Sequence, residues 1–223
     1  MDLKGTLDLV KKCDDIDFIR KNIKIIQYKL QECAQAESSK EINLRYFFDT
    51  NNIIFHTNTN ISWGIPYVDT IKQLAKFIGK QTVLEVYAGL GIWSWLLQEE
   101  GINVIATDKD PLSNFECHKS TVTNVENLTS LDAVIKYPSD ILLMCWPPPY
   151  TNSDSMDYEC LINFKGNYLI FIGEINGCTG SEKLMKEIND SWIQVADIKI
   201  SYWHLPMSNY NDDVYLFERK LIN

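Results

Sequence analysis

Two acids and two glycines are the residues of this chain whose types and spacing most clearly predict chemistry. Glu85 lies in the apolar run Val83–Val86, and Gly89 and Gly91 follow closely after it. Asp108 ends the next apolar run. Glycines let a ligand approach the backbone, and a carboxylate at a strand tip accepts hydrogen bonds from a ribose diol. The spacing therefore predicts a site for a nucleoside-like molecule.

A strand, a glycine turn, a helix and a second strand are the elements that must position these residues. Apolar, strand-forming residues predict strands over 83–86 and 104–108, with a helix over 92–98 between them. In open α/β sheets, ligands bind beyond the carboxyl ends of the strands. We therefore expect the glycine turn and Asp108 at one edge of a parallel sheet.

The incomplete glycine pattern bears on which cofactor fits. A dinucleotide site usually shows G-x-G-x-x-G, but the third position here is Ser94, between Trp93 and Trp95. Glu85 inside the first strand is also costly to bury unless it meets a donor or a cation. The amino group and the sulfonium charge of S-adenosylmethionine would meet that need, which favours this cofactor over a dinucleotide.

The pattern E-x-x-A-G-x-G that begins at Glu85, followed by Asp108, resembles motifs I and II of the class I S-adenosylmethionine-dependent methyltransferases. The resemblance implies that Glu85 holds the amino end of the cofactor and that Asp108 holds its ribose. The chain departs from the family at Tyr87, where a glycine is usual. A dinucleotide site and a nucleotide fold without activity are the alternatives that the residues leave open.

A second segment at a strand end resembles a substrate loop. The predicted strand Asp140–Cys145 runs into Trp146-Pro-Pro-Pro-Tyr150, and prolines make such a segment rigid and extended. It resembles motif IV of amino-methyltransferases, in which an aromatic residue stacks on a planar substrate. Trp146 stands where that motif has a polar acceptor, and Tyr150 lies one residue later than the usual aromatic. Glu174, after the predicted strand Asn167–Ile172, is the candidate base or substrate contact.

From Trp63 to Arg219 the chain resembles a group of class I methyltransferase-like proteins of bacteria and viruses. They share a Trp-x-Ile-Pro segment, the glycine turn, a Cys-Trp-Pro-Pro loop and a Gly-Glu…Gly-Cys-Thr loop. His56 and His204 are candidate bases by residue type alone. No metal ligand is predicted. The predicted catalytic residues are Trp146, Glu174 and Tyr150, and the predicted cofactor-binding residues are Trp63, Pro66, Glu85, Tyr87, Ala88, Gly89, Gly91, Trp93, Asp108, Lys109, Cys145 and Trp146.

The order of predicted elements favours an α/β fold. We predict a doubly wound, mostly parallel seven-stranded Rossmann-like methyltransferase sheet that ends in an antiparallel hairpin, formed by Trp192–Tyr202 and Asp213–Arg219. Between the second strand and residue 130 we expect a helix over Leu112–Lys119 and a strand around Thr121–Val125. Further helices are expected over Tyr67–Ile78, Asp154–Asn163 and Glu182–Asn189, with Ser181 as the cap of the last.

An N-terminal helical extension, residues 1–44, precedes the methyltransferase domain, residues 45–223. Apolar residues recur at three- and four-residue intervals from Leu3 to about Gln35, and Asp14-Asp15 separates two helices. Arg45–Phe48 and Asn52–Phe55 are expected to form a hairpin or a loose arm. The helices are expected to cover the main domain or to contact a second copy or a partner protein.

Composition limits the classes of partner and location. The 223 residues carry a net charge of −9, which argues against an extensive duplex nucleic-acid surface. A small molecule, a protein or an exposed nucleic-acid end fits better as the methyl acceptor. No apolar run approaches the roughly 20 residues that span a bilayer, and no signal peptide is evident. The six cysteines lack C-x-x-C spacing, so we expect a cytoplasmic protein with reduced thiols.

The sequence thus predicts a methyltransferase that uses S-adenosylmethionine and acts on a planar acceptor bearing nitrogen or oxygen. The first alternative is a catalytically silent protein that keeps the nucleoside pocket and grips a partner with its N-terminal helices. The second alternative is a nicotinamide-dependent oxidoreductase.

Overall fold

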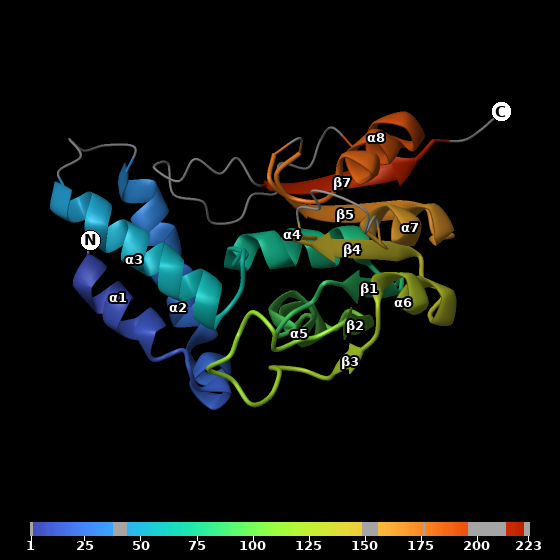
Figure 1. The fold of residues 1–223 in the computed structure, drawn as a ribbon. Coiled ribbons are helices and arrows are strands. Elements are labelled where there is room, and N and C mark those ends of the chain that lie inside the picture. The colour runs from blue at the N-terminus through green and yellow to red at the C-terminus, as the bar shows by residue number, and fades with distance from the viewer. Residues whose placement is uncertain (1, 38–43, 149–155, 176, 196–212, 221–223) are drawn as a thin grey trace.

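A mixed β-sheet with helices on both faces and a helical unit at one end makes up the structure (Figure 1). The computed structural model describes residues 2–37, 44–148, 156–175, 177–195 and 213–220. None of the helices in these ranges combines the length and the apolar character needed to cross a membrane.

Seven strands pair in the order β3-β2-β1-β4-β5-β7-β6. All neighbouring pairs from β3 to β5 are parallel, whereas β7 runs antiparallel to both β5 and β6. This order confirms the predicted fold class, including the antiparallel C-terminal hairpin. The strands are β1 (Val83–Val86), β2 (Val104–Asp108), β3 (Val125–Asn127), β4 (Ile141–Cys145), β5 (Tyr168–Gly173), β6 (Trp192–Gln194) and β7 (Asp213–Arg219).

The three central strands, β1, β4 and β5, are buried on both faces because helices cover both. Leu143 and Ile170 face one core cluster, and their neighbours Leu142 and Leu169 face the other. Continuous apolar runs are therefore what these strands need, as the sequence indicated. The first face is covered by α4 (Val68–Ile78) and α5 (Ile92–Glu99), and the second by α6 (Ser130–Lys136), α7 (Met156–Asn163) and α8 (Glu182–Ser191).

Three helices form the N-terminal helical unit: α1 (Leu3–Lys11), α2 (Ile16–Glu37) and α3 (Leu44–Asn60). The predicted break near Asp14 is confirmed, and the Asp15 carboxylate accepts the Asp17 N–H at 2.9 Å. The hairpin predicted over 45–55 is wrong, because that segment lies within α3. Ile53 and Thr57 are buried one helical turn apart, and this shared face outweighs the turn propensity of the polar residues around it.

The segment between β2 and α6 differs from its prediction. Residues 112–119 form a succession of turns, not a helix, and β3 begins only at Val125. Tertiary contacts decide this course, since Phe115 is buried and His118 Nε2 lies 2.7 Å from the Asn60 carbonyl oxygen. The helix α6, capped by the Thr129 hydroxyl, was not predicted.

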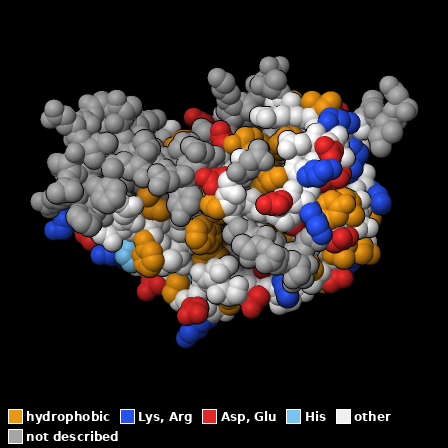
Figure 2. All heavy atoms as spheres, turned by 45° about the horizontal axis from the view of Figure 1, so that its top comes forward, with side chains coloured by type: hydrophobic (Ala, Val, Ile, Leu, Met, Phe, Trp, Pro, Cys, Tyr) orange, Lys and Arg blue, Asp and Glu red, His pale blue; other side chains and the backbone are white. Residues whose placement is uncertain are grey.

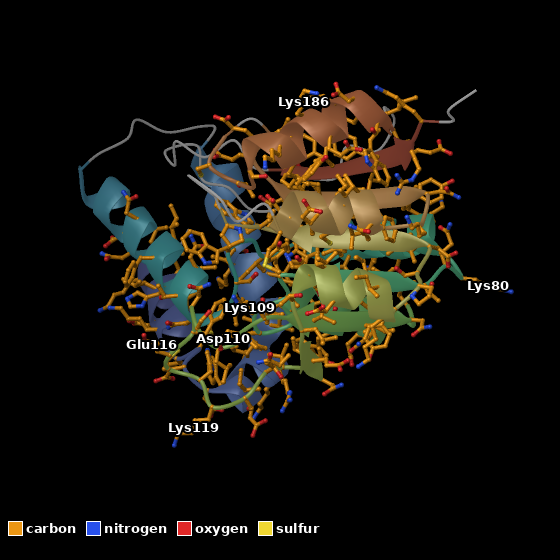
Figure 3. The ribbon with its side chains drawn as sticks, turned by 45° about the vertical axis from the view of Figure 1, so that its right-hand side comes forward. Lys80, Lys109, Asp110, Glu116, Lys119 and Lys186 are labelled. Atoms are coloured by element: carbon orange, nitrogen blue, oxygen red, sulfur yellow. The ribbon has the colours of Figure 1, made fainter. Side chains whose placement is uncertain are left out.

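The helical unit lies against the carboxyl ends of the parallel strands. Arg20 of α2 donates to the Val122 carbonyl at 3.0 Å, and Gln27 donates to the Pro66 carbonyl at 2.7 Å. Figure 3 shows Lys109 and Asp110, which follow β2, near these helices, whereas Lys80 lies at the opposite end of the sheet. The domain boundary placed at residue 44 stays a prediction.

Candidate functional site

Strained backbone marks the carboxyl edge of the sheet. Among the described residues other than glycine, only Tyr87 and Trp146 have positive φ, at +61° and +48°. Each is the first residue after a parallel strand, β1 and β4 respectively. Bulky side chains rarely adopt this conformation, and such strain tends to gather at functional sites. The two outliers independently indicate the edge that the motifs indicated.

The backbone conformation of Tyr87 explains how the turn forms although a glycine is usual at this position in the motif that the chain resembles. Its φ of +61° lies in the left-handed region that favours glycine, so the turn keeps the backbone conformation for which a glycine is usual. The phenol lies 2.9 Å from the Ser130 hydroxyl, and the ring packs on the face covered by α6, α7 and α8. The tyrosine is thus anchored on the α6 side of the turn.

The glycine turn is tightly packed by the segment that follows β2. Gly89 has a φ of +51°, and an added Cβ would lie 2.8 Å from the Phe115 ring. Gly91 has a φ of +78° and caps α5, and its Cβ would lie 2.8 Å from Val125. Both glycines are therefore required by conformation and by space.

The packing around Gly91 makes a prediction about stability. Gly91→Ala should destabilise the protein by about 1–3 kcal/mol more than Gly101→Ala, because overpacking adds to the cost of a positive φ. Gly101 is the matched control, since its φ is +81° and no atom lies within 4 Å of its added Cβ. Urea unfolding of both variants measures the difference, and equal losses of stability would contradict this account.

Glu85 is fully buried beneath the first turn of α5. Its Oε2 accepts the Ser94 N–H at 3.0 Å and also the Ser94 hydroxyl. Burial raises the pKa of Glu85 to about 8, against the lowering effect of the Ser94 hydrogen bonds. Within the described part of the chain, its Oε1 has no hydrogen-bond partner. Ser94 therefore supplies a donor that the sequence analysis did not assign to Glu85, and Oε1 is the oxygen that the cofactor is predicted to meet.

Asp108 lies across the glycine turn from β1. Its Oδ2 accepts the Gly89 N–H at 2.9 Å, and its Oδ1 accepts the Asp110 N–H at 2.8 Å. Burial is the main reason that the pKa of Asp108 is raised, while these two bonds lower it. Each carboxylate oxygen has a second lone pair, so two further hydrogen bonds can be accepted. The neighbouring Lys109 is exposed.

The loops after β4 and β5 are joined to each other. The Trp146 N–H donates to the Ile172 carbonyl at 2.8 Å, and the Gly180 N–H donates to the Pro147 carbonyl at 2.8 Å. Cys145, the last residue of β4, is buried. These bonds hold the start of the predicted substrate loop, Trp146 and Pro147, against β5 and the loop that follows it.

Glu174 is largely occupied with its own loop. Its Oε2 accepts the N–H and the thiol of Cys178, at 2.9 and 2.8 Å, and its own N–H donates to the Thr179 hydroxyl. An added Cβ on Gly177 would lie 2.5 Å from the carboxylate, so a glycine is needed there. The carboxylate thus organises the turn, and its catalytic role stays a prediction.

Two tryptophans from separate segments contact each other, and a third bonds to the residue that follows the first. The rings of Trp63 and Trp146 lie 5.3 Å apart between centroids, inclined by 34°. Trp93 is buried, and its indole N–H donates to the Gly64 carbonyl at 2.9 Å. Figure 2 shows hydrophobic side chains exposed between the helical unit and the sheet. Trp63 has 40% of its surface accessible.

The remaining predicted residues are placed as follows. Pro66 is buried, and Ala88 accepts the Gly91 N–H at 2.8 Å. His56 lies in α3, where burial and then Lys11 lower its pKa. Tyr150 and His204 lie outside the described residues. A cavity of about 470 Å³, lined by Tyr137, Asp140 and Asn167 among others, lies at the opposite edge and includes none of the predicted site residues.

Two contributors to the site were missed by sequence reasoning. Ser94 was noted only as a departure from the dinucleotide pattern, yet it is the hydrogen-bond partner of Glu85. Phe115 covers Gly89 from within a segment predicted as a helix. A helical pattern could not indicate Phe115, because its position depends on turns and on the neighbouring α3.

No family model matches the sequence, and no curated protein matches it. Solved structures align with part of the chain. N-methyltransferase NodS from Bradyrhizobium japonicum WM9, in complex with S-adenosyl-l-homocysteine, is 10% identical over 69% of this chain and 86% of its own, with a TM-score of 0.46. TehB from Haemophilus influenzae is 16% identical over 75% of this chain and 67% of its own, with a TM-score of 0.45. Ribosomal protein L11 methylase from Lactobacillus delbrueckii subsp. bulgaricus is 16% identical over 68% of this chain and 75% of its own, with a TM-score of 0.41. Likeness at this level does not extend to the reaction of this chain.

Proposed function

We propose that this protein is a methyltransferase that uses S-adenosylmethionine. The observation that carries the proposal is the pair of acids on either side of the glycine turn. Glu85 is buried with Oε1 unpartnered among the described residues, and Asp108 sits at the tip of the adjacent strand with lone pairs to spare. A ligand with an ammonium group at one end and a ribose diol at the other fits both acids.

The start of α5 argues against a dinucleotide. Helix N-termini bind pyrophosphate through free backbone N–H groups. Here the Ser94 N–H, in the first turn of α5, is taken by the carboxyl group of Glu85. A phosphate at this position would compete with an acid for the same donor, whereas a cation would pair with that acid. The site therefore favours a cationic nucleoside over NAD or NADP.

The residues of the chain have distinct roles in this proposal. Asp108 accepts the ribose hydroxyls, and Glu85 pairs with the cationic amino end. The Trp146–Pro147 loop is held by two backbone bonds to the end of β5 and the loop after it, which gives the rigid wall that positioning requires. When bound, S-adenosylmethionine supplies a methyl group that is already activated by its sulfonium. The protein mainly orients the acceptor and excludes water.

The acceptor is proposed only by class. A planar molecule bearing a nitrogen or oxygen nucleophile suits the aromatic residues after β4, with Tyr150 and Glu174 as proposed contacts. A small molecule, a protein side chain or an exposed nucleic-acid end all remain within that class. A reducing cytoplasmic location and a partner or second copy bound by the N-terminal helices are also proposals.

A catalytically silent binding protein is the second candidate. Two observations favour it: Glu174 is engaged by Cys178 rather than held ready for a substrate proton, and Trp146 replaces a polar acceptor. Such a protein would bind the cofactor and transfer nothing. Radiolabelled S-adenosylmethionine, incubated with the protein and with nucleic-acid, protein and metabolite pools, separates the two candidates by methyl uptake.

Calorimetry tests the cofactor itself. We expect S-adenosylmethionine and S-adenosylhomocysteine to bind with a dissociation constant below about 100 μM, which corresponds to about −5.5 kcal/mol. NAD and NADP should give no heat under the same conditions. Absence of heat with both S-adenosyl compounds, or tighter binding of NAD, would overturn the proposal.

A further inference from the structure

An exposed tryptophan pair lies next to the proposed cofactor turn. Trp63 and Trp146 are 83 positions apart in the sequence, yet their ring centroids lie within 5.3 Å. Trp146 is half-buried, and Trp63 leaves 40% of its surface accessible. Large aromatic side chains usually gain their stability from burial. A partly exposed pair at the functional edge therefore needs a reason beyond the core.

The sheet order places this pair on the acceptor side of the edge. Asp108 ends β2, the glycine turn follows β1, and Trp146 follows β4, which is the next strand in the sheet. The loop of Trp146 bonds to the loop after β5, still farther from Asp108. A nucleoside anchored at Asp108 and reaching Glu85 thus ends near β4. An acceptor has to approach from the side where the tryptophans lie.

Both tryptophans are held in place by the structure around them. Trp63 precedes Gly64, whose carbonyl accepts the buried Trp93 indole, and Pro66, whose carbonyl accepts Gln27 of α2. Trp146 is fixed by its N–H bond to Ile172 and by the prolines that follow it. Its φ of +48° costs energy that the fold must offset elsewhere. A pre-ordered aromatic surface is the arrangement that these constraints produce.

We propose that Trp63 and Trp146 form the acceptor-binding surface, and that the acceptor presents a flat aromatic ring to it. The proposal rests on the proposed methyltransferase function; it adds the two residues that hold the acceptor and narrows the planar class to an aromatic ring. Stacking on an aromatic side chain suits any flat ring, because it uses the π face and requires no particular hydrogen-bond pattern. Trp63 is the specificity-determining residue, since its ring is the more accessible of the two.

Two probes with the same carbon skeleton test the proposal directly. 2-Naphthol is flat and aromatic, whereas decahydro-2-naphthol is its saturated counterpart, and both are uncharged at neutral pH. We expect saturation-transfer NMR to show binding of 2-naphthol and little binding of decahydro-2-naphthol. Trp63→Leu should weaken 2-naphthol binding by about 5- to 150-fold, the range found when stacking residues are removed. Trp63→Phe, which keeps a ring, should retain more of the affinity.

Ile135→Ala is the control variant, because Ile135 is an exposed apolar side chain on α6 that lines the cavity at the opposite edge of the sheet. It should bind 2-naphthol as the unchanged protein does. Circular dichroism confirms that each variant is folded. Equal binding of the two probes, or equal binding of 2-naphthol by Trp63→Leu and the unchanged protein, would overturn the proposal.

Calorimetry with S-adenosylmethionine separates this inference from the proposed function. Trp63 was also predicted from the sequence as a cofactor contact, so the two roles are compared directly: Trp63→Leu should weaken binding of 2-naphthol by a larger factor than it weakens binding of S-adenosylmethionine. If the variant loses the cofactor and keeps 2-naphthol, the tryptophans serve the cofactor and the proposal is wrong. If the unchanged protein binds 2-naphthol through Trp63 but does not bind S-adenosylmethionine, the proposed ring-binding surface is supported and the proposed methyltransferase function is wrong.

Discussion

Asp108→Ala is expected to weaken binding of S-adenosylmethionine by about 10- to 150-fold. The variant removes the carboxylate that would accept the ribose hydroxyls, and a hydrogen bond to a charged group contributes about 1.5–3 kcal/mol. The Gly89 and Asp110 N–H groups would also lose their acceptor, which loosens the turn. Titration calorimetry with S-adenosylhomocysteine, which lacks the sulfonium charge, should show a loss of similar size.

Asp110→Ala is the matched control for this experiment. Asp110 is exposed, carries the same charge and lies two residues away, and its backbone N–H still donates to Asp108 after the change. It should bind the cofactor within about twofold of the unchanged protein, because a surface charge contributes little. If Asp108→Ala is folded and keeps the original dissociation constant, Asp108 is not the ribose contact and the proposed site is wrong.

Glu85 is expected to make the stability of the protein fall as the pH rises. Its pKa is about 8 in the folded state and 4.5 when unperturbed, so the folded protein holds a proton that the unfolded chain releases. The contribution is fully present below pH 4.5 and is lost as the pH approaches about 8. At 1.36 kcal/mol per pH unit, the loss has a ceiling of about 5 kcal/mol.

Glu85→Gln isolates this effect from every other titrating group. Glutamine keeps an acceptor for the Ser94 N–H but does not ionise, so its own packing cost is the same at every pH. The difference in unfolding free energy between the two proteins, from urea denaturation, should change steadily between pH 5 and 8 in favour of the glutamine variant. Parallel stability curves would show that Glu85 ionises normally.

The same ionisation should be linked to cofactor binding. An ammonium group near Oε1 favours the charged form of Glu85, so the unchanged protein should release a proton when S-adenosylmethionine binds. Binding heats in two buffers of different ionisation enthalpy would differ for the unchanged protein and coincide for Glu85→Gln. Coinciding heats in both proteins would place the amino end of the cofactor elsewhere.

Local patterns predicted the elements that carry the cofactor turn. Apolar runs of four to six residues flanked by glycines or acids need no distant partner to be recognised as buried strands. The strands over 83–86 and 104–108 and the C-terminal strand 213–219 are therefore found where they were predicted, and the strand predicted over 140–145 begins one residue later, at Ile141. The cap of α8 by Ser181 is likewise a local interaction, and its hydroxyl accepts the Leu184 N–H as expected.

The failures occur where distant contacts compete with local propensity. Asp49–Asn51 indicates a turn by residue type, but α3 continues through it because Ile53 and Thr57 bury the same face. Residues 112–119 have helix-forming character, but the Phe115 ring packs against Gly89. In the same segment, His118 contacts the Asn60 carbonyl. Neither partner is near in sequence, so a window of neighbouring residues contains no trace of the contact.

The sequence by itself determined which groups of the candidate site exist and along which edge they lie, because the carboxyl ends of parallel strands converge whatever the loops do. Only the tertiary structure decided how those groups are paired. In the folded protein, Glu85 accepts a hydrogen bond from Ser94, Glu174 accepts one from Cys178, and the rings of Trp63 and Trp146 contact each other. Pairing depends on the direction of each side chain and on the packing of loops, and these are fixed by contacts between segments that the order of residues leaves far apart.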